Sequence, residues 1–313
     1  MQSEAHPYRS VLYMPGSRER ALEKARSLPA DALILDLEDA VAPAEKPRGR
    51  ERVAAAIAAG GYGARRLIIR INGLGTEWGA DDLAAASRAG AHAILLPKVE
   101  DPATIAQVAV AMERHGAPAH TRIWAMMETP RGVLNAAAIA SAHPRLGGCV
   151  MGTNDLAKDL GAASTPERTP MLASLGLCLL AARAEGLVCI DGVYNAFQDE
   201  DGLRAECVQG RDMGFDGKTL IHPAQLAIAN AVFAPSADDI ERARTQVAAF
   251  EAASARGEGV AVVEGRIVEN LHVEAARRLL ARAAAIAALE GAAPCPCSSS
   301  ASPSSSSRIC RAG

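Results

Sequence analysis

The sequence predicts an α/β protein, a (β/α)8 TIM barrel followed by a C-terminal helical extension. Short apolar runs alternate with amphipathic helical segments eight times between residues 10 and 233. The runs are almost continuously apolar, as expected of parallel strands that are covered on both faces. No Gly-x-Gly-x-x-Gly follows the first run, so an open doubly wound sheet, the competing fold, is disfavoured.

Two of the first four strand–helix units carry recognisable helix starts. Ser17 is a favourable N-cap before Arg18 and Glu19, and Asp101-Pro102 opens the fourth helix. Alanine runs favour helix over the segments between the strands. We expect strands at residues 10–14, 32–37, 66–71 and 93–96, and helices at residues 17–27, 45–59, 79–89 and 101–116.

The second four units repeat the pattern. The most apolar stretch, around Leu175 to Ala182, is short and is followed by Arg183 and Glu185. It falls well below the ~20 apolar residues needed to cross a bilayer, so we interpret it as part of a packed helix. We expect strands at residues 122–127, 149–151, 188–190 and 218–221, and helices at residues 131–141, 169–185, 201–213 and 223–233.

The pattern changes after Phe233, which divides the chain into three regions. Residues 1–235 are assigned to the barrel. Residues 236–290 are expected to form a helical lid or oligomerisation segment, because a closed barrel of eight strands has no place for them. Within it we expect helices near residues 237–256 and 273–289 and a short apolar segment at 260–263. Residues 291–313, rich in serine and proline, are expected to be a disordered tail.

Composition and charge limit the classes of function. Among 313 residues, 33 are Lys or Arg and 36 are Asp or Glu, a net charge of −3. This balance predicts neither a nucleic-acid nor a membrane partner. No secretory signal is visible, so we expect a cytoplasmic protein. Cys149, Cys178, Cys189 and Cys207 lie in apolar segments and are expected to be buried free thiols.

The strand ends indicate an active site, because barrels of this class carry their chemistry at the C-terminal ends of the strands. Seven of the eight ends deliver a charged or titratable residue. Each has a structural alternative, such as helix capping by Asp155 or a buried ion pair for Asp36, but their convergence favours an active site. These residues are Asp36, Glu38, Asp39, Arg70, Lys98, Glu128, Asp155, Asp191 and His222.

The acidic residues at strand ends two, five and six predict a site for a hard divalent cation. Mg²⁺ takes one or two protein carboxylates and keeps several waters, and Mn²⁺ is an alternative. Zinc is disfavoured because no Cys/His ligand spacing is present. Arg70 beside such an ion would suit a substrate carboxylate or a developing oxyanion. We therefore expect a metal-assisted reaction of an oxo or hydroxy acid, and the absence of Gly-x-Ser-x-Gly gives serine-hydrolase chemistry no support.

Six short segments occur in an order that resembles a known family. As a set they are similar to the citrate lyase beta subunit and to malyl-CoA and citramalyl-CoA lyases, within the HpcH/HpaI aldolase superfamily. The resemblance spans about residues 9–285. The segments are RSVLYMPG at 9–16, LDLEDAV at 35–41, IRING at 69–73, LPKVE at 96–100, METP at 127–130 and IHP at 221–223.

The resemblance implies a Mg²⁺-dependent carbon–carbon lyase, an oxo-acid lyase of the EC 4.1.3 type. It would cleave or form a 3-hydroxyacyl-CoA such as malyl-CoA, citramalyl-CoA or citryl-CoA, with acetyl-CoA and a 2-oxo acid as the other side of the reaction. Glu128 and Asp155 match the metal ligands of the family. Glu38 and Asp39 match acids that hold the metal's waters, and Arg70 matches the residue that binds substrate oxygens.

The resemblance also implies a binding surface for the CoA thioester. Arg18, Lys24 and Lys46 fall where related proteins place basic residues near the CoA phosphates. Lys98 and His222, at strand ends four and eight, are expected to contact the substrate.

One position departs from the family pattern. Relatives carry an Asp in a segment like Gly-Lys-Met-Ile-Asp that enters a neighbouring subunit's site, and here residues 265–269 end in Glu269. We expect Glu269 to act catalytically within a homotrimer or hexamer. A misplacement of about 1 Å can cost on the order of a hundredfold in rate, so the added methylene leaves the outcome open. The rivals are a malyl-CoA-type thioesterase, a non-catalytic barrel subunit, and an aldolase that acts on free oxo acids.

Overall fold

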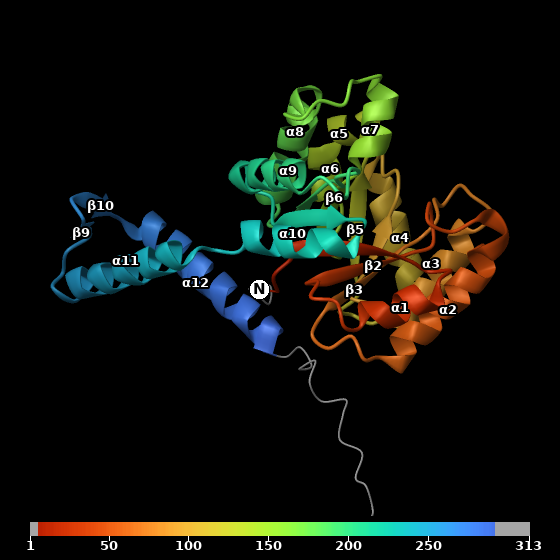
Figure 1. Cartoon of the computed structure of the whole chain (residues 1–313), viewed down its shortest axis with the longest axis horizontal. Coiled ribbons are helices and arrows are strands. Elements are labelled where there is room, and N and C mark those ends of the chain that lie inside the picture. Colours follow the sequence, from red (N-terminus) through yellow and green to blue (C-terminus); the bar gives the residue numbers. More distant parts are fainter. Residues whose placement is uncertain (1–5, 292–313) are drawn as a thin grey trace, which may run out of the picture.

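A closed barrel of eight parallel strands forms the centre of the molecule, as predicted (Figure 1). The computed structural model describes residues 6–291. Each strand pairs with the next, and β8 pairs with β1, where Lys218 lies opposite Ser10. The strands are β1 (Ser10–Pro15), β2 (Ala32–Asp36), β3 (Arg66–Arg70), β4 (Ala93–Leu96), β5 (Arg122–Met127), β6 (Leu146–Met151), β7 (Val188–Asp191) and β8 (Gly217–Leu220).

Helices surround the barrel and cover the outer faces of its strands. Three 3-10 turns, η1 (Pro43–Glu45), η2 (Thr169–Met171) and η3 (Pro223–Gln225), precede α2, α8 and α10. The helices are α1 (Glu19–Ala25), α2 (Lys46–Ala59), α3 (Gly79–Ala89), α4 (Pro102–Arg114), α5 (Pro130–Leu134), α6 (Ala136–Ala140), α7 (Thr153–Leu160), α8 (Leu172–Ala184), α9 (Glu200–Met213) and α10 (Leu226–Phe233).

Four helices differ from the sequence-based expectation. The helix expected from residue 223 begins at Leu226, because Pro223–Gln225 forms η3. The helix expected at residues 131–141 divides at Asn135, whose ψ of 9° leaves the helical range and whose amide donates to Glu100 O at 2.7 Å. The helix expected from residue 169 begins at Leu172, because Thr169–Met171 forms η2. The short helix α7, which starts directly after β6, was not expected.

Two apolar layers, one on each side of the strands, form the core. The outer layer joins strands to helices and includes Leu33, Leu35 and Ile69. Because side chains alternate along a strand, their neighbours point into the barrel. The inner layer consists of Val11, Ala32, Ile34, Ile68, Ala93, Leu95, Trp124, Met126, Val150 and Ile190.

The same alternation places polar residues above the inner apolar layer. Asp36 follows Ile34 by two positions, so it occupies the next inward position of β2. Arg70 stands in the same relation to Ile68, and Glu128 to Met126. The register brings Asp36 and Arg70 opposite each other on adjacent strands. The carboxyl end of the barrel is therefore closed from below by apolar side chains and lined by charged ones.

A buried ionic cluster lies between β7, β8 and α9. Lys218 Nζ is fully buried and contacts Asp191 Oδ2 at 3.2 Å and Glu206 Oε1 at 2.6 Å. Arg168 Nη1 approaches both Asp191 oxygens, at 2.7 and 2.9 Å. Asp191 closes β7, but its side chain is used in this cluster. It therefore does not line the pocket at the strand ends, where the sequence pattern placed it.

An elongated arm follows the barrel (Figure 1). It comprises α11 (Ala237–Ala255), a hairpin of β9 (Ala261–Val263) and β10 (Arg266–Val268), and α12 (Asn270–Gly291). Only an apolar segment was expected where the hairpin forms, and α12 begins three residues before the expected start. The arm stands away from the barrel at the hairpin and returns along α12, where Arg9 pairs with Glu290 at 2.9 Å.

Two further features concern the helices and the cysteines. No helix within residues 6–291 is both long enough and apolar enough to span a bilayer. Cys149, Cys178, Cys189 and Cys207 are buried and free. Burial raises the pKa of the Cys149 thiol to about 12, so this thiol stays protonated and unreactive. The remaining cysteines and the expected tail beyond Gly291 lie outside the described residues.

Candidate active site

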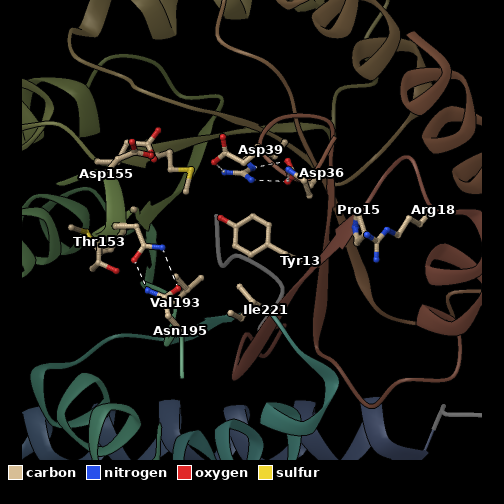
Figure 2. Close-up of a pocket in the computed structure, with 17 residues that line it drawn as sticks. Tyr13, Pro15, Arg18, Asp36, Asp39, Thr153, Asp155, Val193, Asn195 and Ile221 are labelled. Carbon is tan, nitrogen blue, oxygen red and sulfur yellow. Dashed lines mark hydrogen bonds and ion pairs between the residues drawn. The ribbon is translucent and has the colours of Figure 1, made fainter. Parts of the chain in front are cut away.

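A cavity of about 480 Å³ opens at the carboxyl ends of the strands (Figure 2). Asp36, Arg70 and Glu128 line it from β2, β3 and β5. Asn154 and Asp155 line it from the first turn of α7. The cavity lies where a (β/α)8 barrel carries its chemistry, and it collects most of the acidic residues that the sequence placed at the strand ends.

Arg70 is held in one orientation by three carboxylates. Its Nε and Nη2 donate to the two oxygens of Asp36 at 2.7 and 2.6 Å, a bidentate pair. Its Nη1 contacts Glu38 at 2.8 Å and Asp39 at 3.4 Å. Burial alone would lower the pKa of Arg70, but the hydrogen bonds and charge of Asp36 raise it. The guanidinium therefore stays charged, and the ion pair considered for Asp36 is confirmed.

Glu128 is a buried carboxylate fixed by the backbone of the adjacent loop. It is 2% exposed, and its Oε1 accepts the Lys98 N–H at 2.7 Å. Lys98 has a φ of 50°, a left-handed conformation that costs about 1 kcal/mol for a residue with a Cβ. That conformation aims the N–H at Glu128, while Lys98 Nζ pairs with Asp155 Oδ1 at 3.1 Å. Lys98 thus contacts both predicted metal ligands, Glu128 through its backbone N–H and Asp155 through its side chain.

The pocket and its rim hold more acids than bases. Arg70 and Lys98 are the cations paired with these acids. Burial raises the pKa of Glu38 to about 8; the charge of Arg70 opposes this shift, and the charges of Asp39, Glu128 and Asp36 add to it. A divalent cation would relieve this imbalance. The acids are Asp36, Glu38, Asp39, Glu128 and Asp155.

The donor set fits Mg²⁺ better than a metal held wholly by protein. Within residues 6–291, no three His, Cys, Asp or Glu side chains form a metal-binding group. Glu128 and Asp155 instead form a pair of oxygen donors on a cavity that has room for water and substrate. Mg²⁺ prefers this arrangement, because it uses one or two carboxylates and completes its octahedron with water and substrate oxygens.

Residue 152 has to be glycine because the side chain of Glu128 lies directly against it. A Cβ at residue 152 would lie 2.4 Å from Glu128 Cβ and 2.5 Å from Glu128 Oε2. We expect Gly152→Ala to displace this carboxylate and to lower the affinity for Mg²⁺ at least tenfold, with a matching loss of turnover. Isothermal titration with Mg²⁺ would measure the effect, with Gly176→Ala, where a Cβ meets open space on α8, as the control. An unchanged affinity in Gly152→Ala would contradict this reading.

The predicted basic residues are placed in different surroundings. Arg18 lines the pocket from the N-terminus of α1 (Figure 2), whereas Lys24 is exposed on the same helix and does not line it. Lys46 is 6% exposed and donates to Leu37 O, Glu38 O and Asn72 Oδ1. Lys46 therefore stabilises the loop after β2 through its backbone carbonyls, and it does not line the pocket.

His222 and Glu269 are not brought to the pocket within one chain. The Nδ1 atom of His222 accepts the Ala224 N–H at 3.2 Å and caps η3, and its ring lies 4.6 Å from that of Phe197. Glu269 is exposed at the end of β10, on the part of the arm that stands away from the barrel (Figure 1). Any contact of Glu269 with an active site therefore requires another subunit.

Two features of the pocket were missed in the sequence. Tyr13 points inward from β1, and its ring lies against the Arg70 guanidinium, 4.8 Å from centroid to Cζ. Asn154 and Asn195 exchange hydrogen bonds of 2.8 and 3.2 Å across the cavity wall (Figure 2). The inward periodicity of β1 could have indicated Tyr13, but nothing in the sequence pairs two asparagines 41 positions apart.

Comparison with known proteins identifies the family. The model of the HpcH/HpaI aldolase/citrate lyase family matches residues 9–223, most of the barrel. The chain belongs to this family. It is 62% identical over 288 residues to a (3S)-malyl-CoA thioesterase of Cereibacter sphaeroides, covering 92% of this chain and 99% of that protein. It is 35% identical over 287 residues to the citrate lyase subunit beta of Escherichia coli K12, covering 90% of this chain and 95% of the relative.

Solved structures of the family share the barrel. The CitE protein from Mycobacterium tuberculosis, in complex with magnesium, acetoacetate and coenzyme A, superposes with a TM-score of 0.72 at 30% identity, over 90% of this chain and 99% of that one. RipC from Yersinia pestis gives a TM-score of 0.64 at 32% identity, over 76% and 100% of the two chains. The recognised family and the TIM barrel are therefore confirmed.

Proposed function

We propose that this chain is a Mg²⁺-dependent enzyme that hydrolyses a malyl-CoA-type thioester to free CoA and the hydroxy acid. The observation that carries the proposal is the 62% identity, over 99% of its length, to a protein named (3S)-malyl-CoA thioesterase. The pocket supports it with two carboxylates for the metal, the buried Glu128 and the partly exposed Asp155, and with a fixed guanidinium for a developing oxyanion.

The lyase reaction is the second candidate. It is favoured by the 35% identity to a citrate lyase subunit beta and by the family to which the chain belongs. Both reactions need the same substrate contacts and both place negative charge on the thioester oxygen. They differ in the bond that breaks: the carbon–sulfur bond in hydrolysis, or the bond between the second and third carbons of the acyl chain in the lyase.

The residues of the pocket divide the work in either reaction. Glu128 and Asp155 would hold Mg²⁺, which supplies Lewis-acid stabilisation of substrate oxygens. Arg70, oriented by Asp36, would neutralise charge on the reacting acyl group. Glu38 and Asp39 are acids at the rim and are the candidates to take or return a proton. Arg18 faces the pocket and would bind the anionic CoA moiety.

Product analysis distinguishes the candidates. Purified protein with malyl-CoA and Mg²⁺ is expected to release free CoA and malate, resolved by chromatography, and EDTA is expected to abolish the reaction. Mn²⁺ is expected to restore it. Acetyl-CoA with glyoxylate as the product would establish the lyase instead, and no turnover with either malyl-CoA or citramalyl-CoA would favour a non-catalytic barrel.

We further propose that Glu269 completes the active site of a second copy of this chain. It is exposed on the arm, and large apolar side chains beside it are exposed as well: Val262 by 68%, Ile267 by 62% and Leu271 by 60%. An apolar surface of this kind on a projecting arm suits contact with another subunit. In a homotrimer or hexamer this apolar surface would be covered by a neighbouring subunit.

A complementation experiment tests this shared site. Glu269→Gln is expected to lower turnover about a hundredfold. Because Glu128 and Glu269 would serve one site from two chains, co-expression of Glu269→Gln with Glu128→Gln should yield oligomers that recover part of the activity. A monomer by analytical ultracentrifugation, or no recovery in mixed oligomers, would contradict the proposal.

A further inference from the structure

Tyr13 presents a buried hydroxyl that no group in the described part of the chain binds. Tyr13 Oη is shielded from solvent and has no hydrogen-bond partner. In the close-up of the pocket the ring points into the cavity, with the hydroxyl on the side of Thr153 and Asp155 (Figure 2). Buried hydroxyls in proteins are almost always hydrogen-bonded, so an orphan that faces a cavity indicates a partner supplied by a ligand.

The hydroxyl can serve only as a donor or as a neutral acceptor in this position. Burial, opposed by the charge of Arg70, raises the pKa of Tyr13 above its ordinary value, so the phenol keeps its proton. Several carboxylates line the pocket around Tyr13, yet the phenol proton is not donated to any of them. The group that binds it must therefore bring an acceptor oxygen into the cavity.

Tyr13 also differs from the other donors of the pocket. Arg70 donates to Asp36, Glu38 and Asp39, and Lys98 pairs with Asp155. The Tyr13 ring packs against the Arg70 guanidinium, which Asp36 orients, so the position of the ring is coupled to that ion pair. A neutral donor beside carboxylates suits an uncharged carbonyl better than a substrate carboxylate, which the same wall would repel.

We propose that Tyr13 Oη donates a hydrogen bond to the thioester carbonyl oxygen of the bound substrate. The inference rests on the proposed function, but it holds for both candidate reactions. Negative charge develops on this oxygen when water attacks the carbonyl carbon and equally when an enolate forms. A preorganised donor aimed at that oxygen binds the transition state more tightly than the ground state, and therefore acts mainly on kcat.

Tyr13→Phe removes the hydroxyl and keeps the ring on Arg70. With malyl-CoA and Mg²⁺, we expect kcat to fall about a hundredfold, the usual cost of one such donor, while KM rises by no more than about fivefold. The melting temperature should stay the same or rise, since the variant deletes a buried polar group without a partner. A loss of activity without a loss of stability is a result that a purely structural tyrosine would not give.

Two substrate analogues locate the hydrogen bond. A ketone analogue, in which methylene replaces the thioester sulfur, keeps the carbonyl, whereas a thioether analogue lacks it. Tyr13→Phe is expected to bind the ketone roughly fivefold more weakly than the unmodified protein does, as for one lost neutral hydrogen bond, and the thioether equally well. Equal losses for both analogues would overturn the assignment.

Tyr62→Phe is the matched control. Tyr62 is also buried, but its hydroxyl donates to Leu22 O at 3.2 Å, and neither residue lines the pocket. Its removal should lower the melting temperature and leave kcat unchanged. Unchanged kcat in Tyr13→Phe, with an active unmodified protein, would sink this inference alone. An unmodified protein that turns over no thioester would sink both the inference and the proposed function.

Discussion

Replacing Glu128 by glutamine should abolish Mg²⁺-dependent turnover without unfolding the protein. The two side chains have the same shape, and the 2.7 Å hydrogen bond from Lys98 N–H can be kept by the amide oxygen. The change removes one of two charged oxygen donors for the metal. Loss of several kcal/mol of transition-state stabilisation, as expected of a catalytic metal, corresponds to a decrease of at least about a thousandfold in kcat/KM.

The stability of this variant provides an independent readout. Burial, the largest influence, raises the pKa of Glu128, so the charge itself destabilises the metal-free fold. Metal-free Glu128→Gln should therefore melt no lower than the unmodified protein, and the increase in melting temperature on adding Mg²⁺ should disappear. Glu45→Gln, at a partly exposed carboxylate directly before α2, is the control. A Glu128→Gln variant that keeps the Mg²⁺-induced increase would show that the metal lies elsewhere.

Replacing Lys218 by methionine should produce the largest loss of stability. Lys218 is fully buried and offsets the charges of Asp191 and Glu206, with Arg168 on the other side of the cluster. Removing one partner of a buried ion pair costs about 3–5 kcal/mol, because it leaves uncompensated charge in the interior. For a chain of this size, that corresponds to a decrease in melting temperature of roughly 10 °C. Calorimetry would measure it, with Lys158→Met on α7, which belongs to no such cluster, as the control.

The pH dependence of the cluster has a defined sign. Burial raises the pKa of Asp191, but Lys218 and Arg168 outweigh it and hold the pKa below its ordinary value. The unfolded chain therefore takes up the proton first as pH falls below about 4, and the stabilisation from Asp191 is present above that value and lost below it. The stability deficit of Asp191→Asn should be constant from pH 6 to 8 and shrink in acid. A deficit independent of pH down to 3 would contradict this.

The order of the elements could be predicted because it depends on local pattern. Each apolar run in the barrel is followed by helix-forming sequence, and each of the eight predicted strands is present. The errors lie where tertiary contacts override that pattern. Asn135 interrupts a helix because its side chain binds the loop after β4, and Lys46 faces backbone carbonyls because the loop after β2 folds over it. Glu100 is 35 positions from Asn135, and Lys46 also binds Asn72, which is 26 positions away.

The site could be predicted in part for a related reason. The carboxyl ends of parallel strands meet at one face, so Arg70, Glu128 and Asp155 could be grouped from the sequence. The sequence offered a buried ion pair for Asp36 only as an alternative, and it did not identify Arg70 as the partner or Tyr13 as a residue without one. The bidentate hold of Asp36 on Arg70 and the isolation of Tyr13 Oη depend on register, which sets distances between atoms on different strands.

The sequence by itself determined the barrel, the family and the residue types at the active face, because hydrophobic periodicity and short motifs are local properties of a chain. Only the tertiary structure decided that Asp191 belongs to a buried cluster, that Glu269 stands outside its own subunit's pocket, and that Tyr13 carries a free donor. These facts concern burial and partners, and both are set by contacts between segments that are distant in the chain.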